Sequence, residues 1–170
     1  MNRVTAAAAL LMIMPALAPA QNTDPAYRGQ GYAFFGLGTG FPRNPFFKYA
    51  GGGGEGFLYK GFAFGGEIEH AGIGQYNPFN AWIGSADFSY HFGRHAAPRK
   101  LDPFVVGGLS VVGPTQKGNG RGSPAGNFGG GANWWLADHA ALRFELRDVV
   151  GANFWPYDHA LSFRIGVTFR

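Results

Sequence analysis

Charged and apolar side chains alternate strictly between residues 142 and 147. The charged positions are Arg143, Glu145 and Arg147, and the apolar positions are Leu142, Phe144 and Leu146. A β-strand directs successive side chains to opposite faces, so this segment as a strand has one charged face and one apolar face. The same residues include good helix formers, and the apolar residues at 142, 146 and 149 also fit helical spacing. The segment alone leaves strand and helix open, and the rest of the chain has to decide.

Ionisable side chains recur at the polar positions of other alternating segments, with both signs of charge. Such carboxylates and arginines can form a proton or ion pathway, a catalytic centre or a paired polar interior. We favour the paired interior, because opposite charges that face each other offset the cost of removing them from water. The predicted inward-facing network comprises Glu55, Glu67, Glu69, Asp87, His91, Arg143, Glu145, Arg147 and Arg164.

The nearest approach to a nucleophilic constellation is Asp87, Ser89 and His91, which alternate along one segment. A serine nucleophile needs a histidine base beside it and a carboxylate that orients this base. Barrel enzymes that deacylate lipid A have this chemistry, but the chain contains no His-x-Ser sequence. We therefore interpret the three residues as inward hydrogen-bonding groups and predict no catalytic residues and no enzymatic activity.

Two further patterns resemble cofactor sites only formally. Gly51, Gly53 and Gly56 match G-x-G-x-x-G, but a nucleotide site requires a helix next, and FLYKGFAF follows instead. No pair among the five histidines has the spacing of a metal site on one strand or helix. The sequence therefore predicts neither a metal nor a cofactor.

The start of the chain has the pattern of a cleavable secretory signal. A short basic start precedes an apolar run of about a dozen residues, and Ala18-Pro19-Ala20 forms an A-x-A-like end. We expect residues 1–20 to be a signal peptide and residues 21–170 to be a single domain.

The composition after this segment indicates an all-β protein. The chain has 29 glycines and 17 phenylalanines in 170 residues, which disfavours helices. The net charge of +4 is spread out without a basic run, so nucleic acid is not an expected partner. No later apolar stretch approaches the roughly 20 residues of a spanning helix. Spanning barrel strands need only about 10 residues with alternating apolar positions.

Turn residues divide the chain into eight alternating segments. Short connections fall at 60–61 and 137–139, and most of the others are longer, as in an outer-membrane barrel with short periplasmic turns and long outer loops. The sequence therefore predicts an eight-stranded antiparallel up-and-down transmembrane β-barrel, although the facing of the fifth strand stays open. The expected strands are 31–40, 48–59, 62–71, 81–92, 103–113, 125–136, the second arm of a hairpin within 133–150, and 160–170.

Aromatic residues gather near the expected strand ends, where amphipathic rings settle at a membrane surface. Ordinary core aromatics of a soluble barrel are the alternative interpretation. The predicted periplasmic belt comprises Tyr32, Tyr59, Phe62, Tyr90, Phe92, Phe104, Trp134 and Phe169. Outer loops are expected near 41–47, 72–80, 114–124 and 150–159. Candidate contact residues on them are Arg43, Lys117, Arg121 and Trp155. Lys117 and Arg121 can reach lipopolysaccharide phosphates, although a loop of this kind is more often merely solvated.

Three segments together resemble the OmpA-like/OmpX-like eight-stranded outer-membrane barrel domain. GGGANWWLADHAALRFELRD is similar to that family's sixth and seventh strands, DPFVVGGLSVVG to its fifth and FRIGVTF to its closing strand. The resemblance implies residence in the outer membrane, contact with its lipids, and delivery by periplasmic chaperones and the barrel-insertion machinery. It also implies a role in envelope integrity, adhesion or host-factor binding. The sequence departs from the family at Phe169-Arg170, because the family usually ends in an aromatic residue.

The leading hypothesis is a small non-enzymatic outer-membrane barrel with a structural or surface-interaction role carried by its outer loops, for an unidentified surface ligand. One alternative is a lipid A-modifying barrel enzyme. Another is a periplasmic lipocalin-like barrel that binds an apolar ligand, which the charges at Arg143, Glu145 and Arg147 argue against. A small pore is a weaker option, because eight strands enclose only enough space for side chains.

Overall fold

The computed structural model describes residues 28–41, 46–73, 80–92, 100–114, 122–151 and 158–170. The expected signal peptide, residues 1–20, lies outside these ranges. The strands are β1 (Gly29–Phe41), β2 (Phe46–Tyr59), β3 (Phe62–Ile73), β4 (Asn80–His91), β5 (Leu101–Pro114), β6 (Ser123–Ala137), β7 (Ala140–Val150) and β8 (His159–Phe169).

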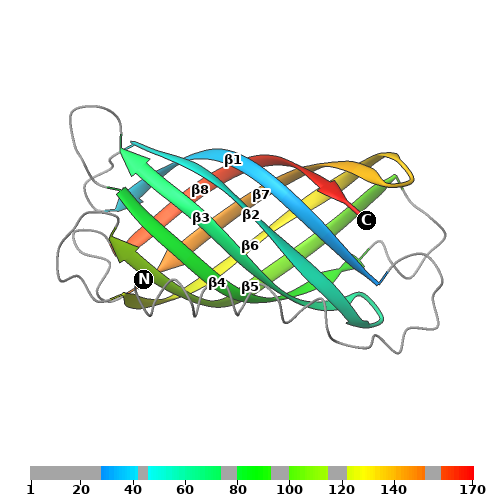
Figure 1. The fold of residues 1–170 in the computed structure, drawn as a ribbon, viewed down its shortest axis with the longest axis horizontal. Helices are drawn as coiled ribbons and strands as arrows, with labels where there is room; N and C mark the ends of the chain where they lie inside the picture. Colours follow the sequence, from blue (N-terminus) through cyan, green and yellow to red (C-terminus); the bar gives the residue numbers. More distant parts are fainter. Residues whose placement is uncertain (1–27, 42–45, 74–79, 93–99, 115–121, 152–157) are drawn as a thin grey trace, which may run out of the picture.

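The eight strands form one closed barrel in which each strand pairs antiparallel with its neighbour in sequence (Figure 1). β1 closes the barrel against β8, with Phe35 opposite Ile165. The predicted eight-stranded up-and-down architecture is thus confirmed, and residues 133–150 belong to the β6–β7 hairpin rather than to a helix. Among the described residues, no helix is long and apolar enough to cross a membrane.

Two tight turns lie at one end of the barrel, together with the last residues of β8; we call this the turn end (Figure 1). Lys60 and Gly61 join β2 to β3 with φ values of 42° and 84°. Two successive positive φ values fit a type I′ turn, whose twist matches that of the strands. Asp138 and His139 join β6 to β7, and the Arg170 N–H donates to the His139 carbonyl at 3.3 Å. Both short connections occur where the sequence predicted them.

The opposite end of the barrel, which we call the loop end, holds the strand ends that flank four of the five remaining connections. These connections contain residues 42–45, 74–79, 115–121 and 152–157 and fall on the predicted outer loops. All four outer-loop contact candidates, Arg43, Lys117, Arg121 and Trp155, lie outside the described residues, so their roles stay predictions.

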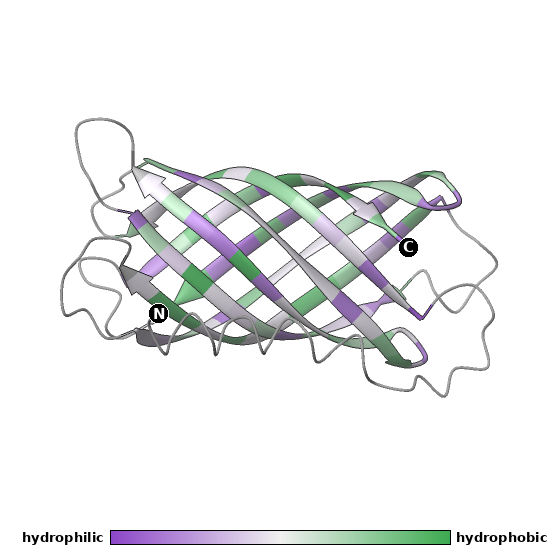
Figure 2. Ribbon diagram, in the orientation of Figure 1, coloured by the Kyte–Doolittle hydropathy of each residue, from purple (hydrophilic) through white to green (hydrophobic). Residues whose placement is uncertain are grey.

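Side chains alternate between the lumen and the outer surface along the strands. In β4, Trp82 and Phe88 are exposed whereas Ser85 and Asp87 are buried. Figure 2 shows this alternation as hydrophobic and hydrophilic bands along the ribbons. The outside is therefore apolar and the inside polar, the reverse of a water-soluble protein. The exposed large apolar residues include Phe35, Leu37, Leu58, Phe62, Trp82, Phe88, Phe92, Leu101, Val105, Leu109, Val111, Phe128, Trp134, Leu136, Leu146, Phe163, Val167 and Phe169.

The register with β4 settles the facing of β5, which the sequence left open. Ser110 lies opposite Ser85, and the two hydroxyls are hydrogen-bonded at 2.8 Å inside the barrel. Leu109 and Val111 consequently face outward. The polar positions of β5 therefore join the lumen.

Two residues predicted for the aromatic belt, Tyr32 and Phe104, point into the lumen instead. Each lies opposite a glycine, Tyr32 opposite Gly53 and Phe104 opposite Gly131. A Cβ atom at Gly53 would lie 2.9 Å from the Tyr32 hydroxyl, and one at Gly131 would lie 2.9 Å from the Phe104 ring. The glycines thus open the space that these rings fill, and the prediction failed because it used closeness to strand ends rather than the alternation. Of the other belt residues, Tyr59, Phe62, Phe92, Trp134 and Phe169 are exposed and Tyr90 is half-buried.

Candidate functional site

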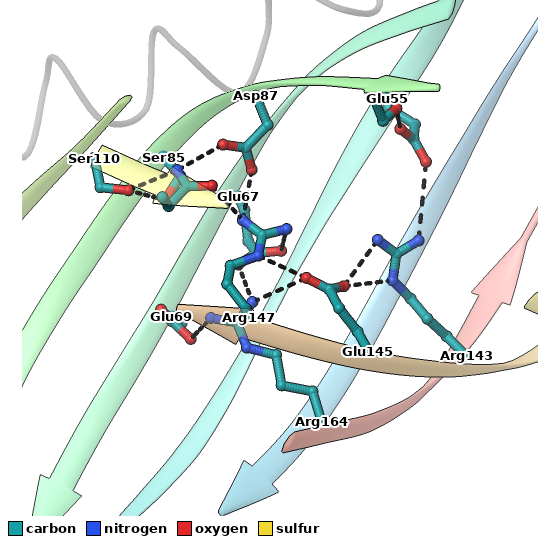
Figure 3. A network of polar contacts seen from close by, with 12 residues as sticks. Glu55, Glu67, Glu69, Ser85, Asp87, Ser110, Arg143, Glu145, Arg147 and Arg164 are labelled. Carbon is teal, nitrogen blue, oxygen red and sulfur yellow. Dashed lines mark hydrogen bonds and ion pairs between the residues drawn. The ribbon is translucent and has the colours of Figure 1, made fainter. Parts of the chain in front are cut away.

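The lumen holds a network of buried ions, most of which Figure 3 labels. It contains six carboxylates, three arginines and one histidine, all at most 7% exposed. All nine residues that the sequence assigned to the interior lie there, together with one further carboxylate. The members are Glu55, Glu67, Glu69, Asp87, Asp102, Glu145, Arg143, Arg147, Arg164 and His91.

Arg147 on β7 is the centre of this network. Its Nε donates to Glu145 Oε1 at 2.6 Å, and its Nη1 donates to Asp87 Oδ2 at 2.8 Å. The same Nη1 lies 3.2 Å from Asn127 Oδ1, and Nη2 lies 3.7 Å from Glu67 Oε2. The planar guanidinium thus links β3, β4, β6 and β7 through one side chain.

Arg164 on β8 extends the network toward the loop end. Its Nη1 donates to Glu67 Oε1 at 2.7 Å, and its Nη2 donates to Glu69 Oε2 at 2.8 Å. Nη1 also lies 3.6 Å from Glu145 Oε1, which places Glu145 between two arginines. Charge-assisted bonds of this kind are stronger than neutral ones, so β3 and β8 are linked across the lumen.

Arg143 extends the network toward the turn end. Its Nε and Nη2 lie 3.0 and 2.9 Å from Glu145 Oε2, and its Nη1 lies 3.9 Å from Glu55 Oε1. The guanidinium also lies 4.2 Å from the ring centroid of Tyr32 and 4.1 Å from that of Phe104. The two inward rings therefore hold Arg143 by cation–π contacts, an arrangement that the sequence analysis missed.

His91 at the end of β4 lies between two carboxylates. Its Nδ1 is 2.8 Å from Asp102 Oδ2, and its Nε2 is 3.2 Å from Glu55 Oε1. A neutral imidazole has one N–H, so only the doubly protonated ring can donate to both partners. Asp102 was missed because the facing of β5 was unknown; its position two residues before the inward Phe104 is the signal that identifies it.

The possible catalytic grouping of Asp87, Ser89 and His91 is not assembled. The Ser89 hydroxyl donates to Glu55 Oε2 rather than to the His91 ring. Asp87 binds Arg147 and also accepts from Asn127 Nδ2 at 2.8 Å. The three side chains thus serve as inward hydrogen-bonding groups, the alternative that the sequence analysis preferred.

An apolar layer lies in the lumen at the loop end of the charged network. It is formed by Phe47, Tyr49, Ala71, Ala81, Ile83, Val112, Ala125, Val149 and Ala160. Phe47 and Ile83 are at most 1% exposed. The lumen is therefore filled by ions toward the turn end and by packed apolar groups toward the loop end. In the described part of the chain, no group of three or more histidine, cysteine, aspartate or glutamate residues is arranged to hold a metal ion.

Replacing His91 by phenylalanine should destabilise the barrel. The substitution keeps a ring beside Phe57 and Phe104 but leaves Glu55 and Asp102 without their shared donor. We expect a loss of about 2–3 kcal/mol in the free energy of unfolding, measured from the urea midpoint in detergent micelles. The control is His139→Phe at the exposed β6–β7 turn, and an equal effect of both variants would contradict the bridging role of His91.

No protein-family model and no curated protein matches the chain. Solved structures of similar fold include the N-terminal β-barrel domain of Pseudomonas aeruginosa OprF, with a TM-score of 0.61, 19% identity, and coverage of 83% of this chain and 95% of that domain. Neisserial surface protein A (NspA) matches with a TM-score of 0.65 and 11% identity, and the match covers 83% of this chain and 94% of NspA. The outer membrane protein OprG from Pseudomonas aeruginosa matches with a TM-score of 0.59 and 7% identity, and the match covers 85% of this chain and 96% of OprG. The chain therefore has the fold of the small eight-stranded outer-membrane barrels.

Proposed function

We propose that this protein resides in the outer membrane as a non-enzymatic barrel with a structural or surface-interaction role carried by the loop end. The observation that carries the proposal is the apolar outer surface around an ionic lumen. Along β4 and the residue after it, the outward positions from Trp82 to Phe92 are apolar or small except for the amphipathic Tyr90. At ~3.3 Å per residue and a strand tilt of about 40°, this stretch covers roughly 25 Å along the barrel axis, the height of an outer-membrane apolar band.

The filled lumen supports a structural role over the alternatives. A ligand-binding barrel of the lipocalin kind needs an apolar cavity, whereas Arg143, Glu145 and Arg147 occupy the interior here. A lipid-modifying enzyme needs an activated nucleophile, and the Ser89 hydroxyl is bound to Glu55. A conducting pore needs an aqueous path, and the apolar layer around Phe47 blocks the lumen near the loop end.

The surroundings of such a barrel define its partners. We propose contact with outer-membrane lipids and lipopolysaccharide, and delivery by periplasmic chaperones and the barrel-insertion machinery. The turn end would face the periplasm and the loop end the outside, as short and long connections do in this class. A surface ligand would then contact the outer loops, with Arg43, Lys117, Arg121 and Trp155 as candidates.

Migration in SDS gels before and after boiling tests the membrane proposal. A closed barrel embedded in lipid should resist SDS at room temperature, so the unboiled protein should migrate differently from the boiled protein. We expect this shift together with recovery in the outer-membrane fraction. A soluble periplasmic protein without a shift would contradict the proposal, and a water-soluble ligand-binding barrel would replace it.

A further inference from the structure

The outer face of the described strands carries charged or imidazole side chains only near the loop end. These residues are Lys48 on β2, His70 on β3, Asp148 on β7 and His159 on β8. Toward the turn end, the outward positions hold apolar residues, glycine, proline and Tyr90. The polar residues therefore mark the edge of the apolar band at which lipid headgroups begin.

These residues form two separate groups of different net charge. Asp148 and His159 pair with each other at 3.0 Å. Lys48, His70 and the outward Asn80 lie on three consecutive strands, and within the described residues no acidic side chain pairs with Lys48. Because no acid balances it there, the β2–β4 group is cationic on a surface that is otherwise apolar.

The three polar side chains surround a position without a side chain. Gly72 lies opposite Lys48 on one side and opposite Asn80 on the other. A Cβ atom at Gly72 would lie 2.9 Å from Asn80 Oδ1 and 3.5 Å from the His70 ring, so both groups lean over the glycine. The edge-on contact of His70 with Trp82, at 5.0 Å between ring centroids, fixes the imidazole. The result is a polar cluster of Lys48, His70 and Asn80 around Gly72.

We propose that Lys48 and His70, beside Asn80, bind the phosphate of an outer-leaflet glycolipid, the lipid A part of lipopolysaccharide. This inference rests on the proposed membrane location of the protein. It adds a specific lipid-binding site on the outer surface of the barrel. The Lys48 ammonium supplies the charge and the His70 ring supplies a hydrogen-bond donor, whereas the Asn80 oxygen over Gly72 is an acceptor. Exposed Leu37 lies opposite Lys48 and exposed Trp82 lies opposite His70, and both provide apolar surface for acyl chains. A free phosphate ion gains nothing from that surface, which favours the lipid as the source of the anion.

The test compares the full chain with the double variant Lys48→Gln and His70→Gln, each folded in phosphatidylcholine vesicles with increasing amounts of diphosphorylated lipid A. The readout is the temperature at which the heat-modifiable band converts, because a ligand that binds the folded state raises this temperature. We expect lipid A to raise it for the native protein. Loss of one lysine near a membrane surface should weaken the apparent affinity about fivefold, and the double variant should lose more.

Three further comparisons make the outcome decisive. Lys60→Gln, which removes an exposed lysine at the turn end, should retain the full response to lipid A. Lipid A without phosphates, and inorganic phosphate alone, should both fail to raise the conversion temperature. An undiminished response of the double variant would overturn the site, and an equal response to inorganic phosphate would overturn the lipid assignment. A native protein that neither inserts into vesicles nor shows a heat-modifiable band would instead overturn the proposed function, and the lipid site with it.

Discussion

Replacing Arg147 by methionine should destabilise the barrel more than any other single change in the lumen. The guanidinium binds Glu145 and Asp87 directly and lies 3.7 Å from Glu67. Its removal leaves six buried carboxylates with two arginines and one histidine. Removing one partner of a buried ion pair lowers the free energy of unfolding by about 3–5 kcal/mol, because the remaining buried charge is then uncompensated. We expect a loss of this size in the free energy of unfolding, measured from the urea midpoint in micelles.

Two companion variants separate charge from packing. Arg147→Met combined with Asp87→Asn should recover part of the lost stability, because one uncompensated carboxylate is then neutral. Arg28→Met removes an exposed arginine outside the network and should change stability by less than about 0.5 kcal/mol. If the double variant were less stable than Arg147→Met alone, the loss would lie in packing rather than in the unbalanced charge.

Replacing Gly131 by alanine should have the second largest effect. A Cβ atom there would overlap the Phe144 carbonyl oxygen and would lie 2.9 Å from the Phe104 ring. The first contact is with backbone, so the β6–β7 pair has to move, and the second displaces one of the rings that hold Arg143. Overpacking costs about 1–3 kcal/mol, and we expect the upper end of this range in the same unfolding measurement.

Gly84 on β4 provides the matched control. It faces outward, and a Cβ atom at this position meets nothing within 4 Å. Gly84→Ala should therefore leave the urea midpoint nearly unchanged. Equal losses in Gly84→Ala and Gly131→Ala would mean that glycine acts through strand flexibility rather than through the space that Phe104 requires.

The architecture could be predicted from the sequence because it depends on the alternation of side chains between the two faces of a strand, which repeats every two residues. Alternation in segments such as 142–147 assigns each side chain to one face, and the tight turns at 60–61 and 137–139 fix where strands reverse. Since eight strands enclose little more space than the side chains need, pairing of inward charges of both signs was expected. The placement of the nine predicted ions follows from the alternation alone, without knowledge of their individual partners.

The partners themselves depend on register, which a single strand does not reveal. His91 was grouped with Asp87 on its own strand, whereas its carboxylates, Asp102 and Glu55, come from β5 and β2. Tyr32 and Phe104 were assigned to the lipid face because they lie near strand ends. Their inward position depends on glycines in neighbouring strands, which only the cross-strand pairing brings opposite them.

The apolar layer near Phe47 and Ile83 has a consequence for how the barrel responds to the surrounding medium. Mobile salt ions weaken exposed charge pairs but screen buried ones far less. The lumenal ions lie beneath this layer and are nearly unexposed, so external electrolyte has little access to them from the loop end. Salt should therefore screen the buried ion pairs of the lumen much less than it screens the exposed Lys48. We expect such a protein to keep its fold in dilute and in salty surroundings, while attraction between Lys48 and anions weakens as the salt concentration rises.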